Sequence, residues 1–288
     1  NINNILDNLN NLKIFTKQNV SREKELLEIR LREEITSVWK TDEIKRSRPT
    51  AVEEAKWGLA VIEDTLWSSI PKICSRFDNS VKKYTKKSLP INYSPFKFSS
   101  WMGGDRDGNP NVTANITKEV ILLSRWEAAS LYEKEFTSLI QNLSLHDCSD
   151  KIRKKVGDTW EPYRVYLRPI RNKLQETQKE IELSMKNKRK TNENLLVNSI
   201  NEILNPLNDV YKSLCEVNCE IIANGIVLDL IRQAHTFGLN LAKLDIRQES
   251  SRHSKLINSI CNKLKIGNYD NWSEDEKISF LSKEYLSK

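Results

Sequence analysis

The segment Ser100–Pro110 constrains the fold of this chain more than any other stretch. An apolar alternation over residues 96–102 leads into it and predicts a short strand. Gly103 and Gly104 then allow a tight turn and a close approach to a ligand or to another main chain, because neither residue carries a Cβ. We therefore expect a strand that ends abruptly in a tightly folded loop.

This loop also carries three consecutive charged residues, Asp105, Arg106 and Asp107. So much paired charge beside special backbone residues is costly unless something holds it, which favours a functional site. A structural loop in which Arg106 bridges the two aspartates is the alternative. A calcium-binding loop would need glycine at its sixth position and glutamate at its twelfth, and this loop has neither.

The composition is that of a mostly helical protein. The 288 residues are 38% hydrophobic and 30% charged, with only 8 Gly and 8 Pro, and could form one large domain or two smaller ones.

No apolar run approaches the roughly 20 residues of a membrane span, and no signal peptide is visible. We expect a soluble protein without a membrane partner. Because the chain begins at Asn1 without Met, we also expect it to be part of a longer protein.

A basic excess is the second feature of the composition. The 46 Lys and Arg against 39 Asp and Glu give a net charge of +7, which permits an anionic partner such as nucleic acid. The basic residues are spread along the chain, and the one dense run, residues 186–190, lies between predicted helices, where a solvated loop is usual. No docking motif and no basic face with interleaved aromatic residues is visible, so we expect no nucleic-acid partner. A basic helical nucleic-acid-binding protein is the alternative from another functional class.

The five cysteines predict a reducing, cytoplasmic location. No Cys-x-x-Cys pair occurs, and an odd count argues against a disulfide framework. Cys215 and Cys219 lie four apart on a predicted helix, but without two further ligands they indicate buried thiols rather than zinc. We expect no metal ligands in this chain.

Helical periodicity and capping signals recur along most of the chain. The predicted helices cover residues 21–40, 50–70, 117–142, 161–186 and 195–237. Thr50 and Glu53 form a capping box, and the helix that they start should stop before Pro71. Thr117 is expected to cap the third helix.

Two prolines and one glycine should set boundaries in the later helices. Pro169 should kink its helix or mark its true start, and Pro206 should interrupt the next helical stretch. Gly238 should end that stretch, because glycine readily adopts the backbone conformation that follows a helix.

We expect a single incomplete domain over residues 1–288. Its predicted parts are helical over 1–95, strand and loop over 96–113, helical over 114–238, strand over 241–249 and a helical tail over 250–288. Short strands that end in polar residues and alternate with long helices predict a mostly α protein with a few short parallel strands. These would form part of a TIM-type (β/α)8 barrel with large helical insertions. Chemistry is expected where the strands end, at Trp101–Asp107 and at Arg247–Glu249.

Four segments resemble signature sequences of one enzyme family, the phosphoenolpyruvate carboxylases. In chain order they are Thr41–Thr50, Phe98–Thr113, Glu161–Val165 and Leu244–Ser250. All four occur in the family's order, and the similarity extends from near residue 20 to near residue 253. A collinear set that includes one long signature is far more specific than a single short motif.

The resemblance implies an enzyme that joins bicarbonate to phosphoenolpyruvate, giving oxaloacetate and phosphate. It also implies Mg²⁺ or Mn²⁺ without biotin, and a cytoplasmic homotetramer. The family's catalytic histidine has no counterpart here, because His146, His235 and His253 lack the Thr-Ala-His-Pro context of that residue. The family's metal-binding carboxylates and glycine-rich basic loop also lie outside this chain. The chain therefore resembles about the N-terminal third of such an enzyme, and we expect it to be inactive alone.

The resemblance also implies roles for individual residues. Arg247 and Arg106 would be catalytic, with Arg247 gripping the substrate phosphate through its paired donors. Trp101 would wall a dry pocket for CO2. The other substrate-binding residues would be Gly103, Gly104, Asp105 and Asp107. The alternatives are an ion pair of Arg247 with Asp245 or Glu249, and a core position for Trp101.

Three basic residues, Lys45, Arg46 and Arg164, match positions at which plant members of the family hold an activating sugar phosphate. The resemblance therefore implies an allosteric anion site. Lys45 departs from the arginine expected there and lacks its bidentate fork, so a solvated basic face is the alternative.

Overall fold

The computed structural model describes residues 8–10, 21–41 and 49–285. Contacts divide the chain into two compact units, Asn1–Arg48 and Pro49–Lys288. In the first unit, α2 (Ser21–Lys40) confirms the helix predicted over residues 21–40. None of the helices in the described residues is both long and apolar enough to cross a membrane.

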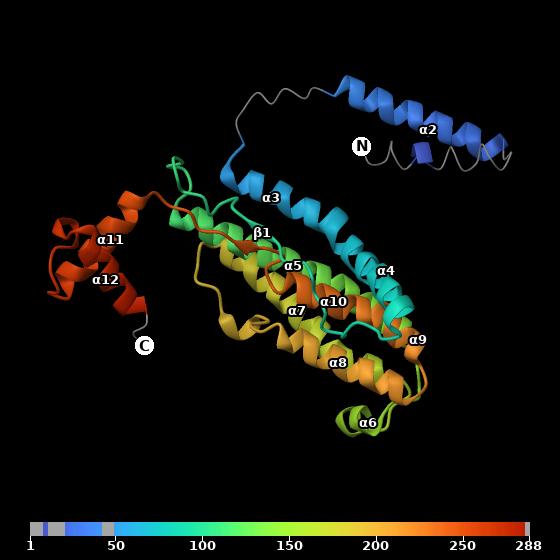
Figure 1. Ribbon diagram of the computed structural model, residues 1–288. Helices are drawn as coiled ribbons and strands as arrows, with labels where there is room; N and C mark the ends of the chain where they lie inside the picture. Colours follow the sequence, from blue (N-terminus) through green and yellow to red (C-terminus); the bar gives the residue numbers. More distant parts are fainter. Residues whose placement is uncertain (1–7, 11–20, 42–48, 286–288) are drawn as a thin grey trace. The chain divides into compact units, whose positions relative to one another are not determined.

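Helices make up nearly all of the second unit (Figure 1). The α-helices are α3 (Ala51–Val61), α4 (Trp67–Thr85), α5 (Ala114–Asn142), α6 (Asp150–Val156), α7 (Pro162–Lys186), α8 (Asn201–Glu216), α9 (Glu220–Ile222), α10 (Leu228–Phe237), α11 (Ser250–Lys263) and α12 (Glu274–Tyr285). The π-helical segments are η1 (Ile62–Leu66) and η3 (Ala223–Val227), and the 3-10 segments are η2 (Glu193–Leu195) and η4 (Tyr269–Asn271). The prediction of a mostly α protein is confirmed.

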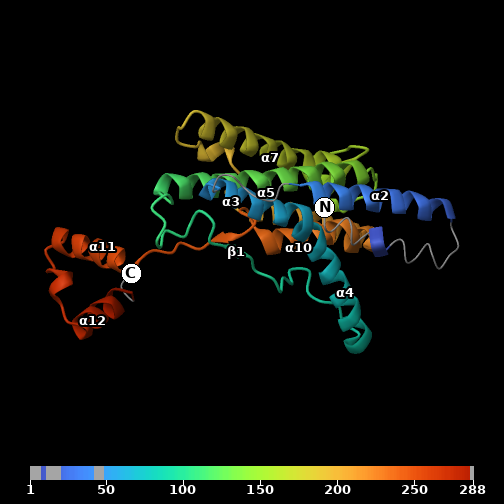
Figure 2. The ribbon, with the colours of Figure 1, turned by 90° about the horizontal axis from the view of Figure 1, so that it is seen from above.

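The core of this unit centres on α5 and α7, which run side by side (Figure 2). Tyr132 and Phe136 from α5 and Leu167 and Leu174 from α7 are almost completely buried. Burial of each such side chain stabilises the fold by about 1.5–3 kcal/mol. Helix α8 contacts both α7 and α10, and α10 in turn contacts α4, so the core continues through these helices.

An aromatic cluster links α4 to this core. Trp67 lies edge-on to Tyr132 and stacks on Phe237, with ring centroids 5.1 Å apart in both pairs. Its indole Nε1 donates to Glu135 Oε1 at 2.9 Å. Phe98 in turn stacks on Phe237, with ring centroids 5.4 Å apart. Because Phe98 directly precedes the first strand, this stack attaches the strand to the helical core.

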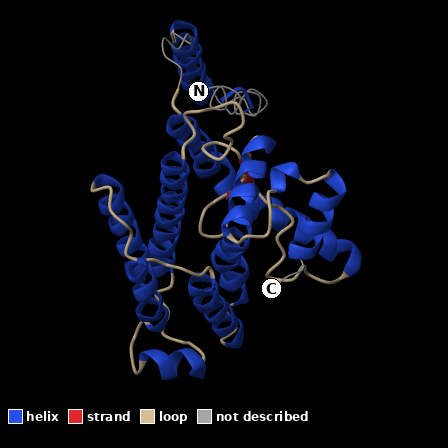
Figure 3. Ribbon diagram, turned by 90° about the vertical axis from the view of Figure 1, so that its left-hand side faces the viewer, coloured by secondary structure: helices blue, strands red, loops and turns tan. Residues whose placement is uncertain are grey.

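The two strands of the unit pair in parallel (Figure 3). They are β1 (Ser99–Ser100) and β2 (Lys243–Leu244). Parallel strands predicted within residues 96–113 and 241–249 are thus confirmed, although each is only two residues long. Each strand has one neighbour, and so short a pair depends on the surrounding helices for its stability. The described residues contain no further strand, so they do not confirm a barrel.

The helix end predicted before Pro71 is wrong, because α4 continues through this residue to Thr85. Pro71 has no N–H to donate to the carbonyl oxygen of Trp67, four residues earlier. The buried side chain of Gln233 in α10 donates its Nε2 to that oxygen at 2.9 Å instead. A tertiary contact therefore replaces the helical hydrogen bond that the proline removes.

Two other prolines lie inside helices without ending them. Helix α7 begins at Pro162, where a missing N–H is harmless, and runs through Pro169, which therefore does not mark its start. Helix α8 runs through Pro206, so the interruption predicted there is wrong. The chain instead turns after α8 at Asn218, whose φ is 59°. Gly238 ends α10 as predicted, with a φ of 59°.

Helix α5 begins one turn earlier than predicted. Thr113 is its N-cap, and the Oγ1 of this residue accepts from the main-chain N of Ile116 at 3.4 Å. Thr117, the predicted cap, lies inside the helix and is buried. Its hydroxyl group is therefore free of the capping role and contacts another part of the chain.

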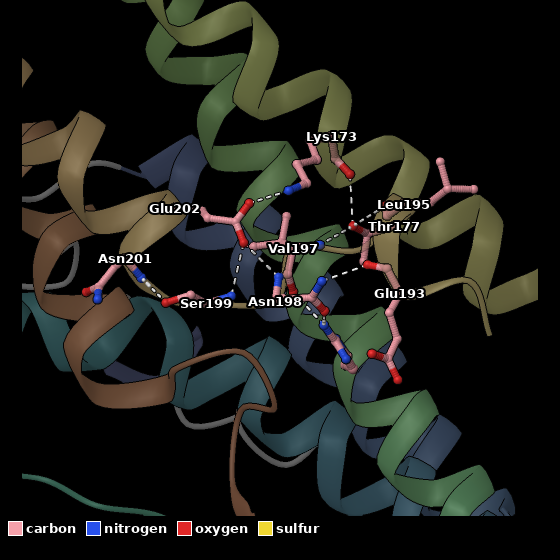
Figure 4. Close-up of polar contacts among 10 residues, drawn as sticks. Lys173, Thr177, Glu193, Leu195, Val197, Asn198, Ser199, Asn201 and Glu202 are labelled. Carbon is pink, nitrogen blue, oxygen red and sulfur yellow. Dashed lines mark hydrogen bonds and ion pairs between the residues drawn. The ribbon is translucent and has the colours of Figure 1, made fainter.

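Polar side chains tie down the segment between α7 and α8, residues 187–200 (Figure 4). Thr177 of α7 accepts a hydrogen bond from the main-chain N of Val197 at 3.0 Å. Glu202 of α8 accepts from the main-chain N of Asn198 at 2.9 Å and from that of the next residue at 3.1 Å. These contacts give hydrogen-bond partners to backbone N–H groups of a segment that has little regular structure, and the N–H of Val197 is buried.

The predicted helical tail is confirmed as α11, η4 and α12. An aromatic cluster holds it together, with Trp272 edge-on to Phe280 at 5.1 Å and 5.5 Å from Tyr269. This small cluster gives the tail a core of its own.

Candidate functional site

The two predicted strand ends lie side by side. Beyond β1 and β2 the parallel pairing continues as a bridge between Asp105 and Arg247. The main-chain N of Arg247 donates to Gly104 O at 3.0 Å, and the N of Arg106 donates to Arg247 O at 2.9 Å. The charged loop is therefore fixed by main-chain hydrogen bonds directly against the end of β2.

The two adjacent glycines of the loop, Gly103 and Gly104, are required by its geometry. A Cβ on Gly104 would stand only 2.3 Å from the carbonyl oxygen of Asp245, in the segment that follows β2. Gly103 has a φ of +80°, and a Cβ there would stand 2.6 Å from Cγ2 of Val120 in α5. The close approach expected from the sequence is therefore an approach to another main chain and to a helix.

Trp101 and Arg247 face each other at the end of the paired strands. The guanidinium carbon of Arg247 lies 5.8 Å from the ring centroid of Trp101, within the range of a cation–π interaction. Trp101 is 58% exposed, so it is not a core residue. Among the residues that the structure describes, Arg247 forms no ion pair with Asp245 or Glu249. The structure therefore supports neither an ion pair of Arg247 nor a core position for Trp101, the two alternatives that the sequence left open.

Arg106 turns away from its neighbouring aspartates and toward α5. Its Nη2 donates to Oγ1 of Thr117 at 3.0 Å, and its Nε is buried without a hydrogen-bond partner. Within the described part of the chain Arg106 forms no ion pair with Asp105 or Asp107, so the alternative of a bridging arginine is wrong. Asp105 Oδ1 instead accepts from the main-chain N of Asp107 at 3.2 Å, which closes a tight turn.

The electrostatics of the site follow from these contacts. Arg247 is exposed, its guanidinium lies over the ring of Trp101, and its side chain forms no hydrogen bond or ion pair with the described residues. No carboxylate in the described ranges neutralises it, so its paired donors remain available to an anion. Such a group at the end of a parallel strand suits a protein that binds an anionic ligand, because guanidinium geometry matches carboxylate and phosphate.

An apolar cavity of about 630 Å³ lies beside the strands. Side chains from α3, α5 and the strands line it, among them Leu59, Met102, Val120 and Leu244. Trp101 is not among the lining residues, and Met102, which follows it, lines the cavity. The predicted role of Trp101 as the wall of a CO2 pocket therefore stays a prediction.

The residues predicted to bind an allosteric anion are described only in part. Lys45 and Arg46 lie outside the described residues. Arg164 donates its Nε to Ile140 O at 2.7 Å and an Nη1 hydrogen to Glu161 Oε1 at 2.5 Å. The first of these contacts gives a partner to one of the C-terminal carbonyls of α5, which lack helical partners. The anion site stays a prediction.

The described residues contain no group of three or more His, Cys, Asp and Glu side chains that could hold a metal ion. Cys219 lies beyond the end of α8, so it does not share a helical face with Cys215. Burial raises the pKa of the Cys215 thiol, which favours its neutral form. Metal binding in a longer protein stays a prediction.

Thr117 is the residue of the site whose part was not predicted from the sequence. Its Oγ1 accepts from Arg106 and donates to Gly103 O at 2.8 Å, so it contacts both ends of the charged turn. The signal that could have identified it is its spacing, because Thr113 and Thr117 lie one turn apart at the start of the same helix. Only the first of them can be the cap.

Comparisons with known sequences identify the family. A family model described as "Phosphoenolpyruvate carboxylase" matches residues 1–288. A phosphoenolpyruvate carboxylase of Marinobacter nauticus is 47% identical over 262 residues, which are 91% of this chain and 30% of that protein. A second one, of Aliivibrio salmonicida, is 46% identical over 266 residues, 92% of this chain and 30% of that protein. The chain belongs to the phosphoenolpyruvate carboxylase family, and it spans about 30% of the length of these curated relatives.

Proposed function

We propose that this chain forms the phosphate-binding side of a phosphoenolpyruvate carboxylase active site. The complete enzyme would join bicarbonate to phosphoenolpyruvate and release oxaloacetate and phosphate. Membership of the family supports the reaction class. The observation that carries the assignment of the site is the exposed side chain of Arg247, whose main chain is paired with the loop and whose guanidinium lies over the ring of Trp101.

In the proposed mechanism, bicarbonate attacks the phosphate of phosphoenolpyruvate to form carboxyphosphate and an enolate. Arg247 would bind the phosphate through two donors that stay charged, and Arg106 would lie beside it in the loop. Negative charge develops on the phosphate as it is attacked, so fixed cations there lower the barrier. Carboxyphosphate then releases CO2, which the enolate attacks, and Trp101 would keep water from the enolate.

The main chain of the loop would shape the phosphate-binding side. The remaining proposed substrate-binding residues are Gly103, Gly104, Asp105 and Asp107. The tight turn at the glycines supports this proposal, because it brings Trp101 and the charged residues to one end of the strands. Asp105 would act by holding the turn through its hydrogen bond to the following main chain.

We propose that Mg²⁺ or Mn²⁺ binds to parts of the enzyme outside this chain, and that biotin is not used. The described residues offer no fitting set of metal ligands, and the steps above use only side chains of this chain. For the complete enzyme we propose a TIM-type (β/α)8 barrel containing β1 and β2, a homotetramer and a cytoplasmic location. The parallel pairing of the strands supports the barrel.

A basic nucleic-acid-binding protein is the other function class weighed from the sequence, and no observation favours it. In the dense basic run at residues 186–190, Arg189 donates to both carboxylate oxygens of Glu180 at 2.7 Å. The Arg189–Glu180 ion pair links the basic run to α7. The charge of Arg189 therefore stabilises the fold of this segment. We propose neither nucleic acid nor a membrane as a partner.

The test is oxaloacetate formation by the complete gene product from phosphoenolpyruvate, bicarbonate and Mg²⁺, coupled to NADH oxidation by malate dehydrogenase. Arg247→Ala should lower kcat/KM for phosphoenolpyruvate about 100-fold, because a lost charged contact to the reacting group costs about 2–4 kcal/mol. Arg252→Ala, at an exposed arginine of α11, is the control and should keep the wild-type value. The 288-residue chain alone should show no turnover. Absence of carboxylation by the complete wild-type protein would refute the proposal.

A further inference from the structure

We infer that Thr117 is a positioning residue for the charged loop, and that its hydroxyl group sets the orientation of Arg106 and, through the main chain, of Arg247. The inference deepens the proposed function and rests on it where it concerns substrate. Its structural part stands on the hydrogen bonds of one buried side chain, which is 7% exposed.

The Thr117 hydroxyl joins three parts of the chain at one point. Its Oγ1 lies 2.8 Å from Gly103 O and 3.0 Å from Nη2 of Arg106, and it also lies 3.2 Å from Thr113 O within α5. A hydroxyl has one proton to donate, and Arg106 can only donate. Thr117 must therefore accept from Arg106, and the shorter distance favours donation to Gly103 over the local bond within the helix.

The orientation of Arg106 depends on this one acceptor. In the described residues, the hydrogen bond to Thr117 is the only one formed by the Arg106 side chain, and its Nε is buried without any. The Arg106 side chain is partly buried, and the loss of its acceptor would leave the desolvation of this charged group without compensation from the described residues. Without the Thr117 hydroxyl, the Arg106 side chain should therefore leave this position for solvent.

The effect should extend to Arg247 through the main chain. The turn extends from Gly103 to Arg106. Within it, the carbonyl oxygen of Gly104 accepts a hydrogen bond from the main-chain N of Arg247 at 3.0 Å. Arg106 N donates to Arg247 O at 2.9 Å, so the same turn holds Arg247 on both sides. A turn released from α5 at Gly103 and Arg106 would hold Arg247 less firmly.

The first arm of the test measures amide hydrogen exchange in the complete gene product. Thr117→Val keeps the shape of the side chain and removes the hydroxyl, whereas Thr117→Ser keeps the hydroxyl. Thr177→Val is the matched control, because Thr177 is also a buried helical threonine and accepts from Val197 N at 3.0 Å. Thr117→Val should speed exchange over residues 104–106 and at Arg247 about tenfold. The serine variant and the control should leave these amides unchanged.

The second arm measures kinetics of the same proteins with phosphoenolpyruvate. Thr117→Val should raise KM for phosphoenolpyruvate about three- to tenfold with a smaller change in kcat, and Thr117→Ser should restore it. Unchanged exchange in Thr117→Val, or equal effects of the serine and valine variants, would overturn the inference. If the wild-type protein carboxylates nothing while Thr117→Val still frees the loop amides, the proposed function fails and the positioning role holds.

Discussion

The guanidinium carbon of Arg247 lies 5.8 Å from the ring centroid of Trp101, although residues 102–246 separate the two in sequence. The parallel pairing of β1 with β2, extended by the Asp105–Arg247 bridge, creates this contact. The cation lies over the ring, and its donors form no hydrogen bond or ion pair with the described residues. Trp101 is therefore expected to orient Arg247 as well as to exclude water.

Under the proposed function, replacing the indole should weaken binding of phosphoenolpyruvate in the complete gene product. Trp101→Ala removes a cation–π contact worth about 0.5–1 kcal/mol at an exposed site, so KM should rise about two- to fivefold. Trp101→Phe keeps a ring face and should lie closer to the wild type. Trp160→Ala is the control, because Trp160 is 80% exposed and contacts His146 instead. Equal effects at Trp101 and Trp160 would contradict an orienting role.

The pairing of the strands should depend on the missing side chain at Gly104. In Gly104→Ala the new Cβ would stand 2.3 Å from Asp245 O, so the two main chains must separate, at a cost of about 1–3 kcal/mol. Gly108→Ala is the control, because a Cβ there meets nothing within 4 Å and only its φ of +66° opposes the change. Hydrogen exchange at Asp245 N and Arg247 N should rise in the first variant alone. Retained protection in Gly104→Ala would count against this account.

The hydrogen bond from Gln233 Nε2 to Trp67 O should contribute to the free energy of unfolding because Pro71 cannot donate to that oxygen. Gln233→Leu should lower the free energy of unfolding by about 1–3 kcal/mol, since it leaves a buried carbonyl without a partner. In a Pro71→Ala background the restored N–H can take over, so the same change should cost about 1 kcal/mol less. Urea unfolding of the four proteins measures this coupling. Identical costs in both backgrounds would show that the two groups act independently.

Acid should remove the stabilisation that Asp209 provides between α6, α7 and α8. Burial raises the pKa of Asp209, but hydrogen bonds from Lys151, Lys155 and Tyr166 outweigh it and hold the pKa at about 2. A carboxyl whose pKa is lower in the folded than in the unfolded chain stabilises the fold above pH 4, and this contribution is lost as the pH falls toward 2. Asp209→Asn should therefore destabilise by about 1–2 kcal/mol at pH 7.

The difference between Asp209→Asn and the wild type should shrink as the pH is lowered from 4 to 2. Urea unfolding at several pH values measures it. Asp158→Asn, at an exposed aspartate after α6, is the control and should parallel the wild type throughout. A constant difference across this pH range would exclude the proposed role of the Asp209 charge.

The location of the candidate site could be predicted from the sequence because its signals are local. Two adjacent glycines, the charged triplet after them and the arginine that follows the second strand are all visible in short stretches of chain. Helix boundaries set by side chains near in sequence were also predicted correctly, as at Thr50, whose capping box with Glu53 is present. These features depend on residues within a few positions of one another.

Features that depend on distant partners could not be predicted in this way. Pro71 stays inside a helix because Gln233 supplies the missing hydrogen bond from another helix. Thr117 resembles a cap as much as Thr113 does, and only the position of Gly103 and Arg106 against α5 distinguishes them. The strands are shorter than predicted, because an apolar side chain before β1 packs against the helices: Phe98 stacks on Phe237 of the helical core.

The long helical excursion between β1 and β2 has a consequence for how the chain folds. Closing a loop of that length carries an entropy penalty that a two-residue ladder cannot offset by itself. We therefore expect helices α5, α7, α8 and α10 to assemble first and to bring the second strand back to the first. The contact between Arg247 and Trp101 would then be among the last to form, and an early block in helix assembly would leave the proposed ligand-binding edge unformed.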